Sequence, residues 1–167
     1  PTNDVGNACI RELRGFGVDT TKIVRKDGRM GIYYLETGAV QRPSKVIYDR
    51  AGSAIAEAKP GDIDWDKAFE GATWFHLTGI TPAISQGAAD LSLEAVKAAK
   101  AKGIHVSCDL NYRKNLWKYG KEPQEVLPPL MEQCDAFFGT DDEYEKVLGM
   151  QLPQFAARDA AYRPDTA

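Results

Sequence analysis

Apolar residues recur with two different periods along the chain, and each period predicts one type of element. Residues 85–103 read SQGAADLSLEAVKAAKAKG, with Leu91, Ala95 and Ala98 on one helical face and Gly103 as the stop. Apolar runs of strand length flank this helix and follow it, at 72–80, 104–110 and 135–139. The second half therefore alternates strand and helix, which is typical of a parallel sheet with right-handed helical crossovers.

Other segments carry weaker helical or turn signals. Helices are predicted over residues 6–16, 64–71, 122–134 and 141–149. In the third of these, the Pro128–Pro129 pair is expected to break or kink the helix, because proline lacks the amide hydrogen and its ring clashes with the preceding turn. Residues 18–24 fit a short strand or a turn, and residues 52–62 fit a linker.

Two β-prone runs interrupt this alternation. MGIYYLE and KVIYDR are rich in Ile, Tyr and Val, and a loop through Arg42 and Pro43 separates them. They predict an antiparallel pair or a small sheet that is appended to the main sheet. The predicted organisation is an α/β domain at 1–29 and 51–150, a β lid at 30–50 and a weakly patterned tail at 151–167.

Composition fits one domain with its own core. The chain has 167 residues, of which 43% are hydrophobic, and 21 basic against 24 acidic residues give a net charge of −3. Without a basic stripe, a nucleic-acid or membrane partner is disfavoured. The three cysteines are far apart, which favours reduced thiols in a cytoplasmic protein. No signal peptide or membrane span is predicted.

Polar groups gather where the predicted strands end, the edge at which ligands bind in parallel sheets. Arg113 offers a planar fork of donors for a carboxylate or phosphate, or else forms a surface salt bridge or caps a helix carbonyl. Asn111 suits a phosphate or a sugar hydroxyl, but equally an Asx-turn, and Asp109 is expected to bond loop amides. On the lid, Tyr33 and Tyr48 fit either cross-strand packing or a ligand site closed from water.

Three further features favour structural roles. Thr140 with Glu143 three residues later forms a capping box, although acidic groups at a helix start also suit a hydrated Mg²⁺. His76 and His105 lie in apolar runs without a metal-ligand spacing and are expected in the core. The chain contains no glycine-rich nucleotide-binding motif and no nucleophile elbow.

Four segments have sequence patterns that are found together in one family: RMGIYYLETG, VIYDRAGSA, FHLTGITPAIS and SCDLNYRKNLW. In order and spacing they resemble the ribokinase-like, phosphofructokinase-B type carbohydrate kinases, and among these the 2-keto-3-deoxygluconate kinases, over residues 6–150. The resemblance implies a three-layer α/β/α sandwich with a small β-sheet lid. It also implies ATP- and Mg²⁺-dependent phosphorylation of a sugar acid. From the architecture, the exposed apolar edges of the lid sheet are expected to form a homodimer.

The resemblance also implies roles for individual residues. The sugar acid would be bound by Tyr33, Tyr48, Arg50, Ile80 and Arg113. Asn111 and Tyr112 would lie on the ATP side, together with Arg113, which would also stabilise the transferred phosphoryl group. Glu143 would act on Mg²⁺ through water. The chain has Thr140 where the family has Asn, which weakens the metal assignment.

Two family motifs do not occur in the chain. These are an early Gly-Gly pair and the Gly-Ala-Gly-Asp segment that holds the general base. The chain is therefore expected to be an internal fragment that carries mainly the sugar side, contains no catalytic base and is inactive by itself. Two alternatives stay open: a kinase for a neutral sugar such as fructose or ribose, and a sugar-acid binding module without catalysis.

Overall fold

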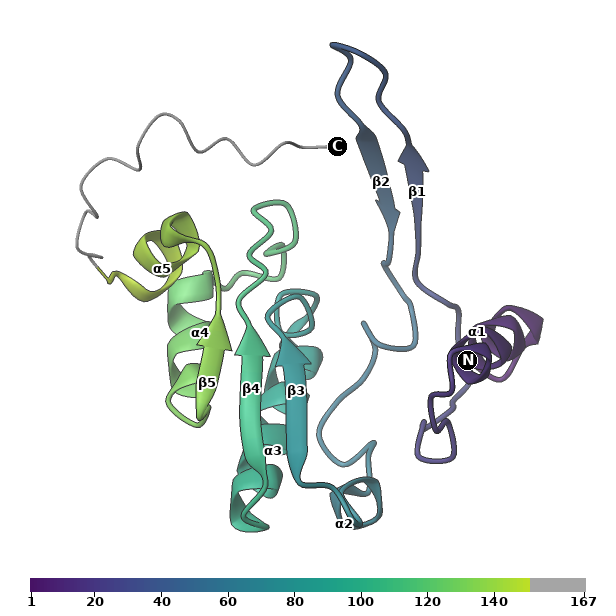
Figure 1. Cartoon of the computed structure of the whole chain (residues 1–167), viewed down its shortest axis with the longest axis vertical. Coiled ribbons are helices and arrows are strands. Elements are labelled where there is room, and N and C mark those ends of the chain that lie inside the picture. Colours follow the sequence, from purple (N-terminus) through teal and green to yellow (C-terminus); the bar gives the residue numbers. More distant parts are fainter. Residues whose placement is uncertain (151–167) are drawn as a thin grey trace.

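A computed structural model describes residues 1–150 of the chain (Figure 1). The predicted tail at 151–167 lies outside the described residues. The helices are α1 (Asp4–Gly15), α2 (Trp65–Ala68), α3 (Gln86–Ala101), α4 (Pro123–Met131) and α5 (Asp141–Leu148). The strands are β1 (Ile32–Glu36), β2 (Lys45–Asp49), β3 (Trp74–Thr78), β4 (His105–Asp109) and β5 (Ala136–Phe138).

The main sheet is parallel, with the strand order β3-β4-β5. Its apolar face packs against helices α3, α4 and α5, as the alternation of strand and helix predicts. On β4 and just beyond it, Val106, Cys108 and Leu110 are completely buried in this core. The helices contribute the residues Val96, Ala99, Leu127, Leu130, Met131 and Val147.

The opposite face of the sheet is not covered within residues 1–150. Trp74 is 56% exposed and Phe138 is 57% exposed, although both lie in strands. His76 and His105 lie on this exposed face, so the prediction that they are core residues is wrong. The segments that contain them, β3 and β4, are largely apolar. Because successive side chains of a strand point to opposite faces, His76 and His105 point away from the core. The described residues therefore form two layers of the sandwich.

Of the break or kink predicted at the Pro128–Pro129 pair of helix α4, the break does not occur. The helix runs from Pro123 to Met131, and the amide of Glu132 still donates to the carbonyl of Pro128 at 3.0 Å. The carbonyls left without partners belong to exposed residues of the preceding turn, where water can bind them. Packing of the buried face holds the helix together. Residues 18–24 form turns and no strand.

The lid is the antiparallel pair β1–β2, which extends past the carboxyl ends of the main strands (Figure 1). One face carries Tyr33 opposite Tyr48, and the other carries Tyr34 opposite Ile47. At its base, Arg29 forms an ion pair with Asp49, which holds the pKa of Asp49 below its usual range. Because both lid faces are exposed, the lid obtains little stability from packing on the domain.

Gly79 allows the loop after β3 to lie against the loop after β4. Its amide donates to the carbonyl of Asp109 at 2.7 Å, which continues the pairing of the two strands by one residue. A Cβ atom at position 79 would lie 2.1 Å from the carbonyl oxygen of Leu110, closer than any real contact. A side chain at this position would therefore push the two loops apart.

Gly79→Ala is expected to lower the free energy of unfolding by about 2 kcal/mol, because backbone on both sides must shift to admit the methyl group. Urea denaturation monitored by circular dichroism measures the change. The matched control is Gly15→Ala at the end of α1, where no atom lies within 4 Å of the added methyl group. Equal stability of the two variants would contradict the close approach at Gly79.

Candidate functional site

The strand ends bring two predicted site residues together around Thr78. Asn111 has a left-handed backbone with a φ of 42°, and its side-chain amide donates to the hydroxyl of Thr78 at 3.3 Å. The same hydroxyl accepts the amide hydrogen of Ile80 at 3.3 Å. Asp109 accepts the amide hydrogen of Asn111 at 3.1 Å, so Asp109 makes the Asx-turn, as its expected role in bonding loop amides predicts.

Glu143 connects the end of β4 to the start of α5. One carboxylate oxygen accepts the amide hydrogen of Tyr112 at 2.6 Å, and the other accepts that of Thr140 at 2.8 Å. Thr140 in turn accepts the amide hydrogen of Glu143, so the predicted capping box is present. Among residues 1–150, no group of three or more His, Cys, Asp or Glu side chains is arranged to bind a metal ion.

Arg113 is exposed at the loop that follows β4. One of its terminal nitrogens donates to the carbonyl of Tyr112 at 3.0 Å. Within residues 1–150 no carboxylate pairs with this guanidinium, so the alternative of a surface salt bridge does not hold there. The other donors of the fork are available to an anion.

The lid residues form a second group. The rings of Tyr33 and Tyr48 lie with their centroids 6.4 Å apart, and the guanidinium carbon of Arg50 lies 4.8 Å from the centre of the Tyr48 ring. This face of the lid therefore presents two phenols and one cation together. In the described part of the chain, no hydrogen bond or ion pair joins this group to Arg113 or Asn111.

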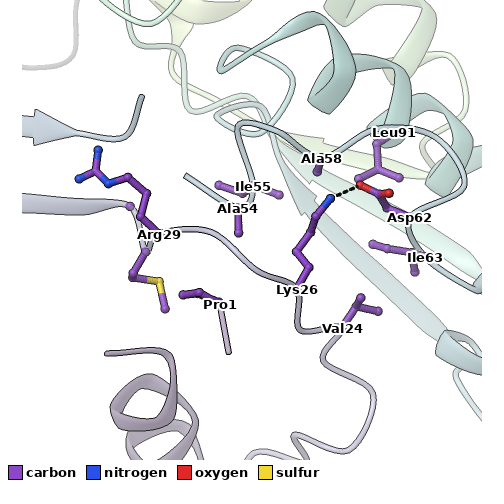
Figure 2. Close-up of a pocket in the computed structure, with 12 residues that line it drawn as sticks. Pro1, Val24, Lys26, Arg29, Ala54, Ile55, Ala58, Asp62, Ile63 and Leu91 are labelled. Atoms are coloured by element: carbon purple, nitrogen blue, oxygen red, sulfur yellow. Dashed lines mark hydrogen bonds and ion pairs between the residues drawn. The ribbon is translucent and has the colours of Figure 1, made fainter. Parts of the chain in front are cut away.

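A cavity of about 230 Å³ lies at the base of the lid (Figure 2). Its wall is mainly apolar, with Ile55 and Leu91, and Figure 2 shows Lys26 reaching across it to Asp62 at 2.7 Å. This contact holds the pKa of Asp62 below its usual range. None of the predicted site residues lines the cavity.

The cysteines do not contribute a nucleophile at these strand ends. Burial raises the pKa of Cys108 to about 12 and that of Cys134 to about 11, so both thiols stay protonated and inert at neutral pH. Cys9 is exposed on α1. No helix in residues 1–150 is both long and apolar enough to cross a bilayer.

Sequence reasoning missed Tyr119, which takes part in the contacts between the strand-end loops. Its hydroxyl donates to the carbonyl of Pro82 at 2.6 Å, and burial raises the pKa of Tyr119 to about 12. The two residues are 37 positions apart, and Tyr119 lies in the polar segment KYGKE. No local pattern in the sequence indicates such a contact.

Fold and site together define a class: an α/β domain with a β lid beside the carboxyl ends of its strands, in which Asn111 and Arg113 lie at the strand ends and the lid carries two phenols and a second guanidinium group. A family model described as "pfkB family carbohydrate kinase" matches residues 2–163. The chain belongs to the pfkB family of carbohydrate kinases.

Individual relatives agree with this assignment. A 2-dehydro-3-deoxygalactonokinase of Haloferax volcanii is 33% identical over 148 residues, which are 89% of this chain and 46% of the relative. A 2-dehydro-3-deoxygluconokinase of Thermoproteus tenax is 30% identical over 159 residues, 93% of this chain and 47% of the relative. The chain spans about half the length of the curated relatives it matches.

Solved structures show the same fold. The crystal structure of a 2-dehydro-3-deoxygluconokinase from Thermotoga maritima is 50% identical with a TM-score of 0.85, covering 91% of this chain and 46% of that one. A putative ribokinase II from E. coli is 21% identical with a TM-score of 0.72, covering 91% of this chain and 48% of that one. The ribokinase-like fold is thereby confirmed, with this chain as an incomplete form of it.

Glu143→Gln is expected to lower the free energy of unfolding by about 1–2 kcal/mol, because the amide can accept only one of the two backbone bonds and presents donors to the other. Thermal or urea unfolding measures the loss. Glu145→Gln, on an exposed position of the same helix, is the control and should be neutral. Equal effects of the two changes would show that the two backbone hydrogen bonds to Glu143 contribute nothing to the free energy of unfolding.

Proposed function

We propose that the protein containing this chain phosphorylates a sugar acid of the 2-keto-3-deoxygluconate type with ATP, and that these 167 residues carry mainly the sugar side. Membership of the carbohydrate kinase family supports the reaction class. The relatives named above as kinases of dehydro-deoxy sugar acids support the substrate class.

The observation that supports a sugar acid over a neutral sugar is that two arginines of the candidate site have no carboxylate partner. Neither Arg50, beside the lid, nor Arg113, at the strand ends, pairs with a carboxylate within residues 1–150, whereas Arg29 and Arg42 both do. The other arginines of this range without a carboxylate partner, Arg11, Arg14 and Arg25, lie on α1 or against it, away from the strand ends. An acidic sugar offers one carboxylate and several hydroxyls, which suit guanidinium forks combined with phenol and amide groups. A neutral sugar would leave both cations without a counter-charge.

The roles proposed for the site residues follow from this chemistry. Tyr33, Tyr48 and Arg50 would bind the sugar from the lid, and Ile80 and Arg113 from the strand ends. Arg113 would also stabilise charge on the transferred phosphoryl group, and Asn111 with Tyr112 would lie on the ATP side. Phosphoryl transfer depends mainly on positioning and charge stabilisation, so a closing lid that excludes water favours it.

The described residues fit Mg²⁺ poorly. They contain no cluster of acidic or imidazole ligands, and both oxygens of Glu143 already accept backbone hydrogens. The role of Glu143 that these bonds support is to hold Tyr112 in place. We assign no general base among residues 1–150, and the 167 residues alone are expected to be inactive.

Arg113→Ala in the full-length protein is expected to lower kcat/KM for a ketoaldonic acid about 30- to 100-fold, because charged hydrogen bonds are lost. The loss for a neutral hexose should be much smaller. Coupled ATP consumption against a panel of both substrate classes measures the difference. Arg11→Ala, an exposed arginine on α1, is the matched control.

Each outcome of that panel selects one function. Equal losses on acidic and neutral sugars would remove the carboxylate argument and favour a kinase for fructose or ribose. Binding of a sugar acid by the wild-type protein without ATP consumption would identify a binding module.

We also infer that the second face of the lid binds a second copy of the protein. If Tyr33, Tyr48 and Arg50 face the sugar, the opposite face still exposes Tyr34 and Ile47, which are 58% and 54% exposed. A two-stranded sheet is marginal by itself, and a symmetric partner would bury this face against its own copy.

Ile47→Lys is expected to shift the protein toward the monomer, because burying an ammonium group in an apolar interface is costly. Sedimentation velocity measures the change in mass. Val40→Lys at the fully exposed lid tip is the control. A monomeric wild-type protein, or one whose mass both variants leave unchanged, would rule out this interface.

A further inference from the structure

Tyr119 ties together the two loops that carry Ile80 and Arg113. Its hydroxyl donates to the carbonyl oxygen of Pro82 at 2.6 Å, and the ring packs beside Trp117 with centroids 6.1 Å apart. Trp117 in turn packs against the hydrophobic core, which anchors the aromatic pair.

The acceptor lies in a tight segment just after Ile80. The amide of Ala83 donates to the carbonyl of Ile80 at 3.1 Å, so Pro82 is enclosed in this turn, and its side chain is fully buried. The next residues lead to Ser85, whose side chain caps α3 by accepting the amide hydrogen of Ala88. The position of Pro82 is therefore fixed by the surrounding structure. A hydrogen bond to its carbonyl oxygen holds the donor, the side chain of Tyr119, in a defined position as well.

The donor lies at the far end of an irregular loop. Arg113 begins this segment, and the amide of Leu116 donates back to the carbonyl of Arg113 at 3.0 Å. No regular element spans the residues from Arg113 to Glu122, where α4 is capped. At its near end the loop is held by Glu143, which binds the amide of Tyr112. At its far end the loop is held by the hydrogen bond from the hydroxyl of Tyr119 to the carbonyl of Pro82.

We propose that Tyr119 is a positioning residue of the sugar site, which fixes the loop of Arg113 relative to the loop of Ile80 without touching the substrate. The inference rests on the proposed function, because it assumes that both loops bind the sugar. The phenol remains a donor over the working range of pH, since burial keeps it protonated. Loss of the hydroxyl releases the far end of the loop while the core beneath Trp117 stays packed.

The test is Tyr119→Phe in the full-length protein, which keeps the ring and removes only the donor. The matched control is Tyr144→Phe: the hydroxyl of Tyr144 also donates to a backbone carbonyl, that of Phe137 at 3.1 Å, but it joins α5 to β5 and no strand-end loops. Melting temperatures show whether the two changes cost similar stability. Binding of 2-keto-3-deoxygluconate is measured by calorimetry, and KM and kcat by coupled ATP consumption.

Tyr119→Phe is expected to weaken sugar-acid binding about five- to tenfold, the effect of one hydrogen bond, with KM rising in parallel. The value of kcat should change less than twofold, and Tyr144→Phe should leave both binding and KM within twofold. Hydrogen exchange over residues 113–122 should become faster in Tyr119→Phe alone. A wild-type protein that binds the sugar acid while Tyr119→Phe binds equally well would overturn this inference and leave the proposed function intact. A wild-type protein that neither binds nor phosphorylates sugar acids would overturn both.

Discussion

The close approach of backbone at Gly79 is the constraint on which the arrangement of the strand ends depends. Because no side chain stands between this residue and the carbonyl of Leu110, the pairing of β3 and β4 continues beyond the last regular pair. Thr78 then meets Asn111, and Ile80 leaves the sheet in a fixed direction. A sheet edge with wider spacing would leave these groups on separate, independently moving loops.

Glu143 shows how one carboxylate can serve two structural tasks. Its position at the start of α5 suits capping, and the same side chain also reaches the amide of Tyr112. Backbone amides therefore compete for the oxygens that a metal-bound water would need. The Thr140 hydroxyl accepts the amide hydrogen of Glu143 and so completes the cap. The loops after β4 and β5 thus act as one unit.

Periodicity predicted the elements well, since the helix of residues 86–101 and the three strands of the main sheet are strongly patterned. It failed where tertiary packing decides: α4 passes through Pro128, and His76 points away from the core. The residue types at the strand ends were recognisable from the sequence, but their partners were not. The contact of Tyr119 with Pro82 joins distant segments and leaves no periodic trace.

The uncovered face of the sheet has a consequence for handling the protein. Trp74 and Phe138 are exposed there, and β3 forms an edge of the sheet within residues 1–150. Apolar surface beside a free strand edge is a template for chains to stack on one another. In a preparation of these 167 residues alone, aggregation rather than unfolding is therefore expected to limit the usable concentration.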